Sequence, residues 1–279
     1  MEPRAYSNAP TGLNFLIAGY THSDGGVATD PSLQLTNAKI STHGPLFGYV
    51  RSLGLGGKSA KLQVILPFSW LDGSADLAGA PMSREVSSLA DPKVSLSVNV
   101  LGAPALPLAS FRGYKQDLIV GVGLQVSAPL GQYDSDRLVN IGTNRWSFKP
   151  EVGVSKVLGR LSLDASAAAT FYADNDEFFG GSTRTQDPLY AGQAHAIYNF
   201  PSQIWLALDA TYYFGGESSV DGVPSDDRLG NSRVGITAAI PVDRSNSFKV
   251  AASHGVSART GGDYDAIGVA WQYRWGGGS

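Results

Sequence analysis

The sequence contains no cysteine, which excludes disulfide bridges, iron–sulfur clusters and zinc sites built on thiolates. Charged residues make up only 16% of the 279 residues, and the formal net charge at pH 7 is −3. Since no basic stripe is present, nothing points to a nucleic acid partner. The four histidines, His22, His43, His195 and His254, do not have the spacing of a metal site. We therefore expect no metal, no cofactor and no nucleic acid.

Long apolar runs are also missing. The chain has no stretch of 18 apolar residues, so a transmembrane helix is excluded. The first ten residues, MEPRAYSNAP, lack the apolar core of a signal peptide. Such a start fits a cytoplasmic protein, and it equally fits the mature form of an exported protein that has received a new Met1.

What the sequence does contain is alternation with a period of two. In RWSFKPEVGVSKV, residues 145–157, apolar side chains stand at every second position from Trp146 to Val154, and the intervening residues are polar or small. A β-strand with this pattern has one apolar face and one polar face. Twelve segments show it: Leu13–His22, Leu46–Leu53, Ala60–Trp70, Lys93–Leu101, Asp117–Leu130, Arg145–Val157, Leu161–Ala173, Leu189–Phe200, Gln203–Phe214, Arg233–Val242, Phe248–Ser257 and Ala266–Trp275. No convincing amphipathic helix accompanies them.

The connections between these segments are alternately long and short. The long ones hold most of the acidic residues, so a meander of these strands would have one elaborate, anionic end and one compact end. An even number of strands with this rhythm is typical of outer-membrane β-barrels. Soluble sandwiches usually need Greek-key crossovers instead.

The alternation alone leaves open which face lies inside. A soluble β-sandwich or lipocalin-like barrel would bury the apolar face. Three features favour a lipid-facing apolar side. Aromatic residues gather near the ends of the apolar face, as interfacial girdles require; they are Trp70, Trp146, Phe171, Tyr190, Tyr212 and Phe214 at the long-loop end, with Tyr198, Phe200, Phe248, Tyr273 and Trp275 at the other.

The second feature is that charged residues stand in the middle of the polar face. The third is width: twelve strands enclose more space than an eight-stranded barrel, and small residues such as Ala165, Ala167 and Ala169 would leave voids there. We therefore predict an all-β fold, a transmembrane antiparallel up-and-down β-barrel of 12 strands, with the polar face inside.

The inward phase gives a set of candidate pore-lining residues: Arg51, Lys61, Lys93, Asp117, Arg145, Lys149, Glu151, Asp164, His195, Trp205, Asp209, Arg233, Lys249 and Arg274. They could form a neutralising lattice of ion pairs that fills a narrow barrel, or a constricted pore with a mild preference for anions. We also place Phe47, Tyr49 and Tyr213 in this phase, as space-filling side chains or as a stacking surface for aromatic solutes. Segment 46–53 has the weakest alternation, because Phe47 and Tyr49 share a phase with Arg51.

Several stretches resemble one known family. They are EPRAYSNAP at 2–10, TGLNFLIAGY at 11–20, ADPKVSLSVNVLGAPAL at 90–106, QDLIVGVGLQVSAPLGQYD at 116–134, NIGTNRWSFKPEVGVSK at 140–156, ADNDEFFGG at 173–181, ALDATYYFGG at 207–216 and AIGVAWQYRWGGG at 266–278. Over essentially the whole chain they resemble the outer-membrane transporter-like proteins of the "MetA pathway of phenol degradation" family. The resemblance implies a β-barrel in a Gram-negative outer membrane, linked by name to aromatic catabolism, with no established substrate and no catalytic residues.

These observations give a provisional organisation. Residues 1–11 form a periplasmic segment or a plug, 12–276 the barrel and 277–279 a tail. We expect passive uptake of small molecules, aromatic compounds among them, by a monomer in contact with lipid and lipopolysaccharide, with an oligomer left open. The alternatives are a closed structural or adhesion barrel and an outer-membrane hydrolase.

The hydrolase is the weaker alternative. His254 lies on the apolar face, but Ala252 and Val256 stand where a partner serine would be needed, and Ser253 and Ser257 face the other way. The loop acids Asp174, Asp176, Asp226 and Asp227 could form a protease-like or calcium site. Solvated loop tips, or contacts with lipopolysaccharide bridged by divalent ions, explain them more simply. We expect no enzyme.

Overall fold

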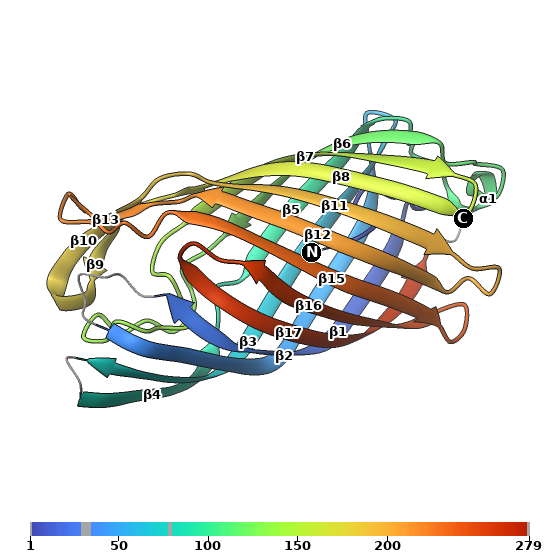
Figure 1. Cartoon of the computed structure of the whole chain (residues 1–279). Coiled ribbons are helices and arrows are strands. Elements are labelled where there is room, and N and C mark those ends of the chain that lie inside the picture. Colours follow the sequence, from blue (N-terminus) through green and yellow to red (C-terminus); the bar gives the residue numbers. More distant parts are fainter. Residues whose placement is uncertain (1, 29–34, 78–79, 278–279) are drawn as a thin grey trace.

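A computed structural model describes residues 2–28, 35–77 and 80–277. It is a closed antiparallel β-barrel (Figure 1). The wall consists of twelve strands: β1 (Leu13–Ala28), β2 (Leu35–Leu55), β3 (Lys58–Leu77), β5 (Lys93–Leu101), β6 (Leu118–Ser127), β7 (Ser147–Leu158), β8 (Leu161–Tyr172), β11 (Leu189–Asn199), β12 (Trp205–Gly215), β15 (Leu229–Pro241), β16 (Asn246–Ser257) and β17 (Gly261–Gly276). The predicted twelve-stranded barrel is confirmed.

The strands follow one another around the barrel in sequence order. The wall closes where β1 pairs with β17, in a ladder that runs from Leu13 opposite Gly276 to Ala28 opposite Gly261. Closure removes the unpaired edges of a sheet, so the backbone polar groups of the wall find partners inside it.

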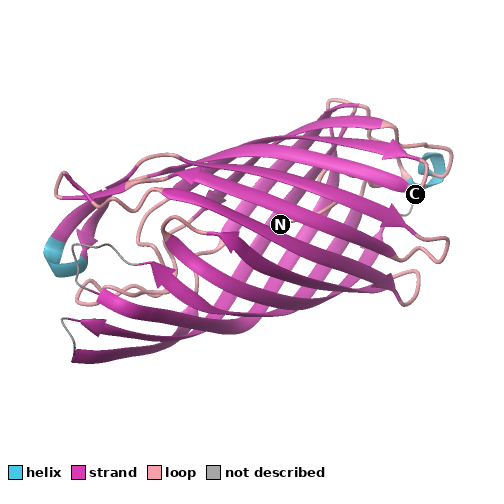
Figure 2. Cartoon of the chain, viewed as in Figure 1, coloured by secondary structure: helices cyan, strands magenta, loops and turns pink. Residues whose placement is uncertain are grey.

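The remaining elements decorate the long-loop end and the turns. Strand β4 (Ala80–Leu89) pairs with the C-terminal half of β3, from Phe68 to Leu77. The two strands form a hairpin at the long-loop end. A second, four-stranded sheet consists of β9 (Asn175–Phe178), β10 (Ser182–Gln186), β13 (Ser218–Val220) and β14 (Val223–Pro224). A 3-10 turn (Phe179–Gly181) and the short helix α1 (Leu108–Phe111) are the remaining elements of regular secondary structure (Figure 2). In the described part of the chain no helix is long and apolar enough to cross a membrane.

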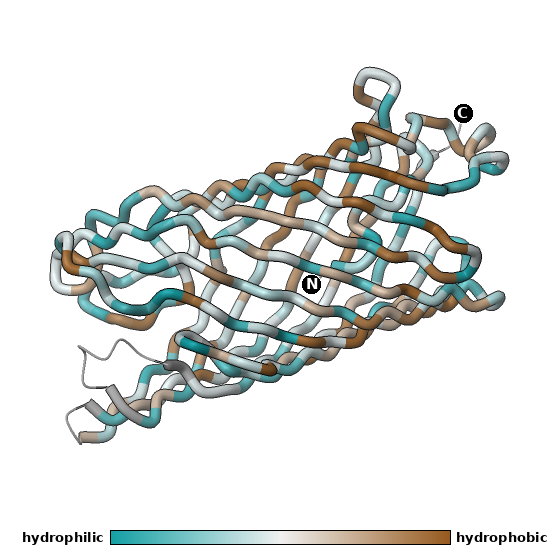
Figure 3. The backbone as a smooth tube through the Cα atoms, turned by 45° about the horizontal axis from the view of Figure 1, so that its top comes forward, coloured by the Kyte–Doolittle hydropathy of each residue, from teal (hydrophilic) through white to brown (hydrophobic). Residues whose placement is uncertain are grey.

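Hydrophobic and hydrophilic residues alternate along the strands of the wall (Figure 3), and large apolar side chains are exposed on its outer face. All eleven predicted girdle aromatics are exposed, between 38% for Tyr273 and 50% for Tyr212. Polar side chains are buried instead, among them Asp164, Asp209 and Arg233, each less than 9% exposed. This distribution is the reverse of that in a soluble protein, and it means that the apolar side faces lipid and the polar side faces the lumen.

The predicted inward phase of segment 46–53 is wrong. Phe47 is 53% exposed, and the Tyr49 ring lies 6.3 Å from that of Trp275 on the outer face. Arg51 shares their outward phase and is exposed near the short turns. The physical reason is that the ends of a lipid-facing strand accept arginine as well as aromatic rings, since a long side chain can extend its charge to the interface.

Two further candidates lie at the short-turn rim rather than along the lumen. Asp117 precedes β6, is exposed and forms an ion pair with Lys156 at 2.5 Å. Arg274 is also exposed, and its Nε donates to the carbonyl oxygen of Arg244 in the turn before β16. The alternation pattern extends one residue before β6 at Asp117, and it includes Arg274, which is still paired with Phe15 of β1 but lies at the exposed end of that ladder. The pattern gives the phase of a residue and not its depth, so it assigned both residues to the lumen wall.

Candidate functional site

The lumen is the candidate site, and the N-terminal segment occupies part of it. Tyr6 is only 4% exposed and lies against Gly121 of β6 and Gly153 of β7, which are directly opposite each other. A Cβ atom added at Gly121 or Gly153 would stand 2.1 Å or 2.0 Å from the Tyr6 ring. The two glycines therefore form a slot that only a residue without a side chain can provide.

Hydrogen bonds hold this segment on several sides. The Tyr6 hydroxyl donates to Glu151 at 2.6 Å, and Asn99 Nδ2 donates to the Tyr6 carbonyl at 3.0 Å. Lys61 Nζ reaches the carbonyl of Ala5 at 2.8 Å. These contacts come from β3, β5 and β7, so the segment crosses the lumen instead of following one strand.

The beginning of the segment makes ionic contacts. The Arg4 amide donates to Asp164 at 2.9 Å, and its guanidinium lies 5.7 Å from the Trp205 ring centroid. Lys249 forms an ion pair with Glu2 at 2.8 Å. At the other end Gly12, with φ at 79°, turns the chain into β1.

A buried polar network lies beside the segment. Asp164, His195 and Asp209 stand directly opposite one another on β8, β11 and β12. His195 Nδ1 is 2.7 Å from Asp209 Oδ1, and the Thr237 hydroxyl donates to the other oxygen at 2.6 Å. Both oxygens of the Asp209 carboxylate are thus bonded, which is what burial of a charge requires.

The outer half of the lumen, toward the long loops, is richer in cations. Lys93, Lys149, Arg145 and Arg233 face it, and both arginines are only 7% exposed. Lys149 Nζ is 3.7 Å from Glu151, the same carboxylate that accepts the Tyr6 hydroxyl.

The guanidinium groups of this half stack on aromatic rings. That of Arg145 lies 4.6 Å from the Tyr172 centroid and that of Arg233 lies 3.7 Å from the Tyr264 centroid. Among the described residues, neither Arg145 Nη1 nor Arg233 Nη1 has a hydrogen-bond partner, although both are buried.

The small second sheet lies at this end of the barrel, on the left in Figure 1. Arg184 on β10 donates to Ser218 at 3.3 Å and lies 3.5 Å from Asp227. At the tip, the Thr183 amide donates to Asp221 and holds the pKa of that carboxyl below its usual value. Of the predicted loop acids, Asp226 pairs with Arg259 at 3.2 Å. The described residues contain no group of three or more His, Asp or Glu side chains placed to hold a metal ion.

One carboxylate, that of Asp91, binds both ends of the loop between β6 and β7. Asp91 is 6% exposed, lies between β4 and β5, and accepts hydrogen bonds from the Gly131 amide and from both the amide and the hydroxyl of Thr143. Strand β6 ends at Ser127 and β7 begins at Ser147, so this clasp closes the wall where the ladder between those strands has ended.

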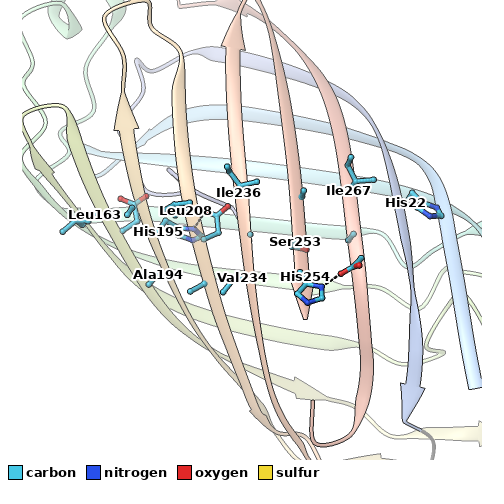
Figure 4. A pocket seen from close by; sticks show the side chains of 18 of the residues that line it. His22, Leu163, Ala194, His195, Leu208, Val234, Ile236, Ser253, His254 and Ile267 are labelled. Carbon is cyan, nitrogen blue, oxygen red and sulfur yellow. Dashed lines mark hydrogen bonds and ion pairs between the residues drawn. The ribbon is translucent and has the colours of Figure 1, made fainter. Parts of the chain in front are cut away.

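A groove of about 1110 Å³ crosses the outer wall over β8, β11, β12, β15–β17 and β1 (Figure 4). Its sides are outward apolar residues such as Leu208, Ile236 and Ile267. His254 also lines it, 2.5 Å from Asp265, and both side chains are more than two thirds exposed. Among the described residues, His254 bonds to Asp265 and to no serine or threonine hydroxyl.

The structure thus brings eleven of the fourteen candidates to the lumen side and leaves Arg51, Asp117 and Arg274 outside it. That the eleven line an open pore stays a prediction. The predicted site residues did not include the glycine slot, Asn99, Asp91 or the aromatic partners Tyr172 and Tyr264. Glycine at inward positions of neighbouring strands, in GVG at 121–123 and EVGV at 151–154, was the signal available for the slot.

The sequence of the chain matches a known protein family. Residues 22–271 match the family model described as "Putative MetA-pathway of phenol degradation". The chain belongs to this family. No curated protein matches the sequence significantly.

Solved structures share the fold. A COG4313 outer membrane channel from Pseudomonas putida F1 is 23% identical, with a TM-score of 0.83 over 99% of this chain and 100% of that one. The transport unit of the autotransporter AIDA-I from Escherichia coli has a TM-score of 0.58 at 9% identity, covering 98% and 92%. A deltaS2S3 mutant of the monoaromatic hydrocarbon channel TodX has a TM-score of 0.51 at 13% identity, covering 98% and 94%.

Proposed function

We propose that the protein is a passive outer-membrane channel for small molecules, aromatic compounds among them. The observation that carries the proposal is the reversed polarity of the barrel, whose closed wall presents apolar residues to lipid and charged residues to the lumen. The family description names phenol degradation, and TodX is called a monoaromatic hydrocarbon channel. Both support an aromatic solute. Lipid and lipopolysaccharide contacts, and a monomeric state, are part of the same proposal.

The N-terminal segment favours a second candidate, a closed structural barrel. Tyr6 packs into the glycine slot on the lumen side of β6 and β7 and so occupies part of the lumen. The two functions differ in whether that segment can leave. It precedes β1 and supplies no strand of the wall, and hydrogen bonds and packing hold it in the lumen. Such an element can be removed without breaking the wall.

Single-channel conductance in a planar bilayer separates the two. We expect small steps from the intact chain and much larger steps from a variant lacking residues 2–10, because the deletion frees the lumen cross-section. The variant Tyr6→Ala is the companion, and heat-modifiable gel migration verifies that each barrel is folded. Absence of steps from all three proteins, despite verified insertion, would leave the closed barrel as the function.

A further inference from the structure

The arginines of the lumen share one arrangement. All four cation–π pairs found among the described residues lie in the lumen or at its mouth: Arg4 with Trp205, Arg145 with Tyr172, Arg184 with Phe178 and Arg233 with Tyr264. A ring that covers the face of a guanidinium leaves its edge, where the N–H groups point, available for an acceptor in the same plane.

Arg233 shows this arrangement most clearly. It lies on β15 in the inward phase, with its guanidinium stacked on Tyr264 at 3.7 Å. One terminal nitrogen, Nη2, donates to the Ser253 hydroxyl at 2.9 Å. The other, Nη1, is buried and has no partner in the described part of the chain. One edge of this guanidinium therefore remains without an acceptor.

A second polar group without a partner lies beside it. Thr211 on β12 stands directly opposite Arg233, and its side chain is 3% exposed. The hydroxyl of Thr211 is buried and is not hydrogen-bonded to any described residue. A buried polar group without a partner costs free energy, so two on neighbouring strands indicate that an acceptor belongs between them.

The charge of Arg233 also indicates an anionic ligand. Among the described residues, no carboxylate forms an ion pair with Arg233 within 4.0 Å. The carboxylate of Asp263 lies against Gly255, which stands opposite Arg233 on β16, but it does not contact the guanidinium. The inner cations Lys61 and Lys249 contact the N-terminal segment instead. A buried cation without a directly paired anion is unfavourable, and an anion in the lumen would supply that pair.

We propose that Arg233, Thr211 and Ser253, together with the ring of Tyr264, form a binding site for a small aromatic anion. The carboxylate of the ligand accepts from the free edge of Arg233 and from the Thr211 hydroxyl. Its ring lies among the inward tyrosines, Tyr264 and Tyr213. The Arg145–Tyr172 pair, nearer the mouth, forms a second site that would bind the same kind of ligand. The inference rests on the proposed channel, because the ligand must be able to enter the lumen.

The arrangement distinguishes three kinds of solute. A neutral aromatic alcohol would gain the ring contact but leave the guanidinium without a counterion. A non-aromatic carboxylate would gain the charge-assisted hydrogen bonds and lose the ring contact. An aromatic carboxylate gains both, so it binds most tightly of the three.

The test measures binding rather than transport. Benzoate, benzyl alcohol and cyclohexanecarboxylate are titrated into the refolded full chain in deuterated detergent, and dissociation constants are taken from saturation-transfer difference NMR. Empty micelles correct for partitioning. The variants are Arg233→Gln and Tyr264→Leu. Arg160→Gln is the matched control, because Arg160 is exposed in the turn between β7 and β8 at the opposite end.

We expect benzoate to bind more tightly than the other two solutes, and Arg233→Gln to weaken it by about tenfold or more, because a charge-assisted hydrogen bond is lost. Tyr264→Leu should remove the preference for benzoate over cyclohexanecarboxylate, and Arg160→Gln should change neither. Arg233→Lys, which keeps the charge without the planar fork, should bind with intermediate strength. This result would separate binding from a merely structural brace.

Equal binding of benzoate and benzyl alcohol, or unchanged benzoate binding in a folded Arg233→Gln variant, would overturn the site. Conductance measured on the same samples keeps the two proposals apart. Conductance steps without benzoate binding would support the channel and refute the binding site. Benzoate binding without any steps, even after deletion of residues 2–10, would keep the site and remove the channel.

Discussion

The two halves of the lumen bury polar groups in different ways. In the inner half, the N-terminal segment supplies partners, as for Glu151 with Tyr6 and Lys249 with Glu2, and Asp209 is bonded on both oxygens. In the outer half, Arg145 and Arg233 are equally buried but keep N–H groups without partners among the described residues. Two buried oxygens elsewhere, Asp164 Oδ1 and Ser59 Oγ, also have no partner among the described residues, but the buried guanidinium N–H groups without partners belong to Arg145, Arg184 and Arg233. The outer half therefore has the properties of a site that an anion completes.

Breaking the inner network should have the largest effect on stability. Asp209→Ala leaves His195 and Thr237 buried without their shared acceptor, and we expect the free energy of unfolding to fall by about 3 kcal/mol. Urea unfolding of the refolded barrel in micelles measures it. Thr237→Val, which removes only one of the two bonds, should cost about 1 kcal/mol. Equal losses from the two variants would contradict a network centred on Asp209.

Filling the glycine slot should release the segment. Gly153→Ala places a methyl group in the position of the Tyr6 ring, so Tyr6 loses its packing and its hydrogen bond to Glu151. We expect the seated state to be destabilised by about 2 kcal/mol, and the single-channel conductance to rise.

The neighbouring strand β6 offers a matched control for the slot. Gly123→Ala adds the same atom to the inward face of β6, where its nearest neighbour would be 3.6 Å away, an ordinary contact. Its conductance should equal that of the intact chain. A rise in both variants would mean that the segment is loosened by any change in β6 or β7, not by loss of the slot.

Replacing an arginine of the outer half should cost less than breaking the inner network. Arg145→Met removes the bond to Gln186 and the stacking on Tyr172, but it also removes a buried N–H group without a partner. These effects oppose each other, so we expect a change within about 1 kcal/mol in the free energy of unfolding. A loss as large as that of Asp209→Ala would show that Arg145 is structural and would remove the contrast between the halves.

The fold could be predicted from the sequence because a barrel wall is governed by a single period. Exposed residues such as Trp146 and buried ones such as Asp164 follow the alternation directly. The prediction failed where the wall ends. Long connections at 23–45 and 71–92 were expected to be loops, yet β1–β4 continue into them as paired hairpins. Alternation cannot show how far a ladder extends past the membrane.

The site was less predictable, because its decisive contacts join residues far apart in sequence. Tyr6 meets Glu151 across 145 positions, and Arg233 meets Tyr264 only because β15, β16 and β17 are neighbours. No local pattern encodes such pairs. The prediction for Arg51 was wrong for a different reason. An arginine at the end of a strand can lie at the membrane interface as well as in the lumen, and alternation does not distinguish the two.

The smallest effect is expected at the rim, where the ion pair of Asp117 and Lys156 lies outside both halves of the lumen. The Asp117 side chain is 74% exposed, so solvent and salt screen the pair, and Asp117→Asn should change the free energy of unfolding by less than about 0.5 kcal/mol. Conductance and ion selectivity should also stay the same, because the residue does not face the lumen. Lys149→Gln, which removes a lumen cation beside Glu151, should shift the reversal potential in a salt gradient. A shift of the same size from Asp117→Asn would place that carboxylate in the ion path and extend the charged lumen to the short-turn rim.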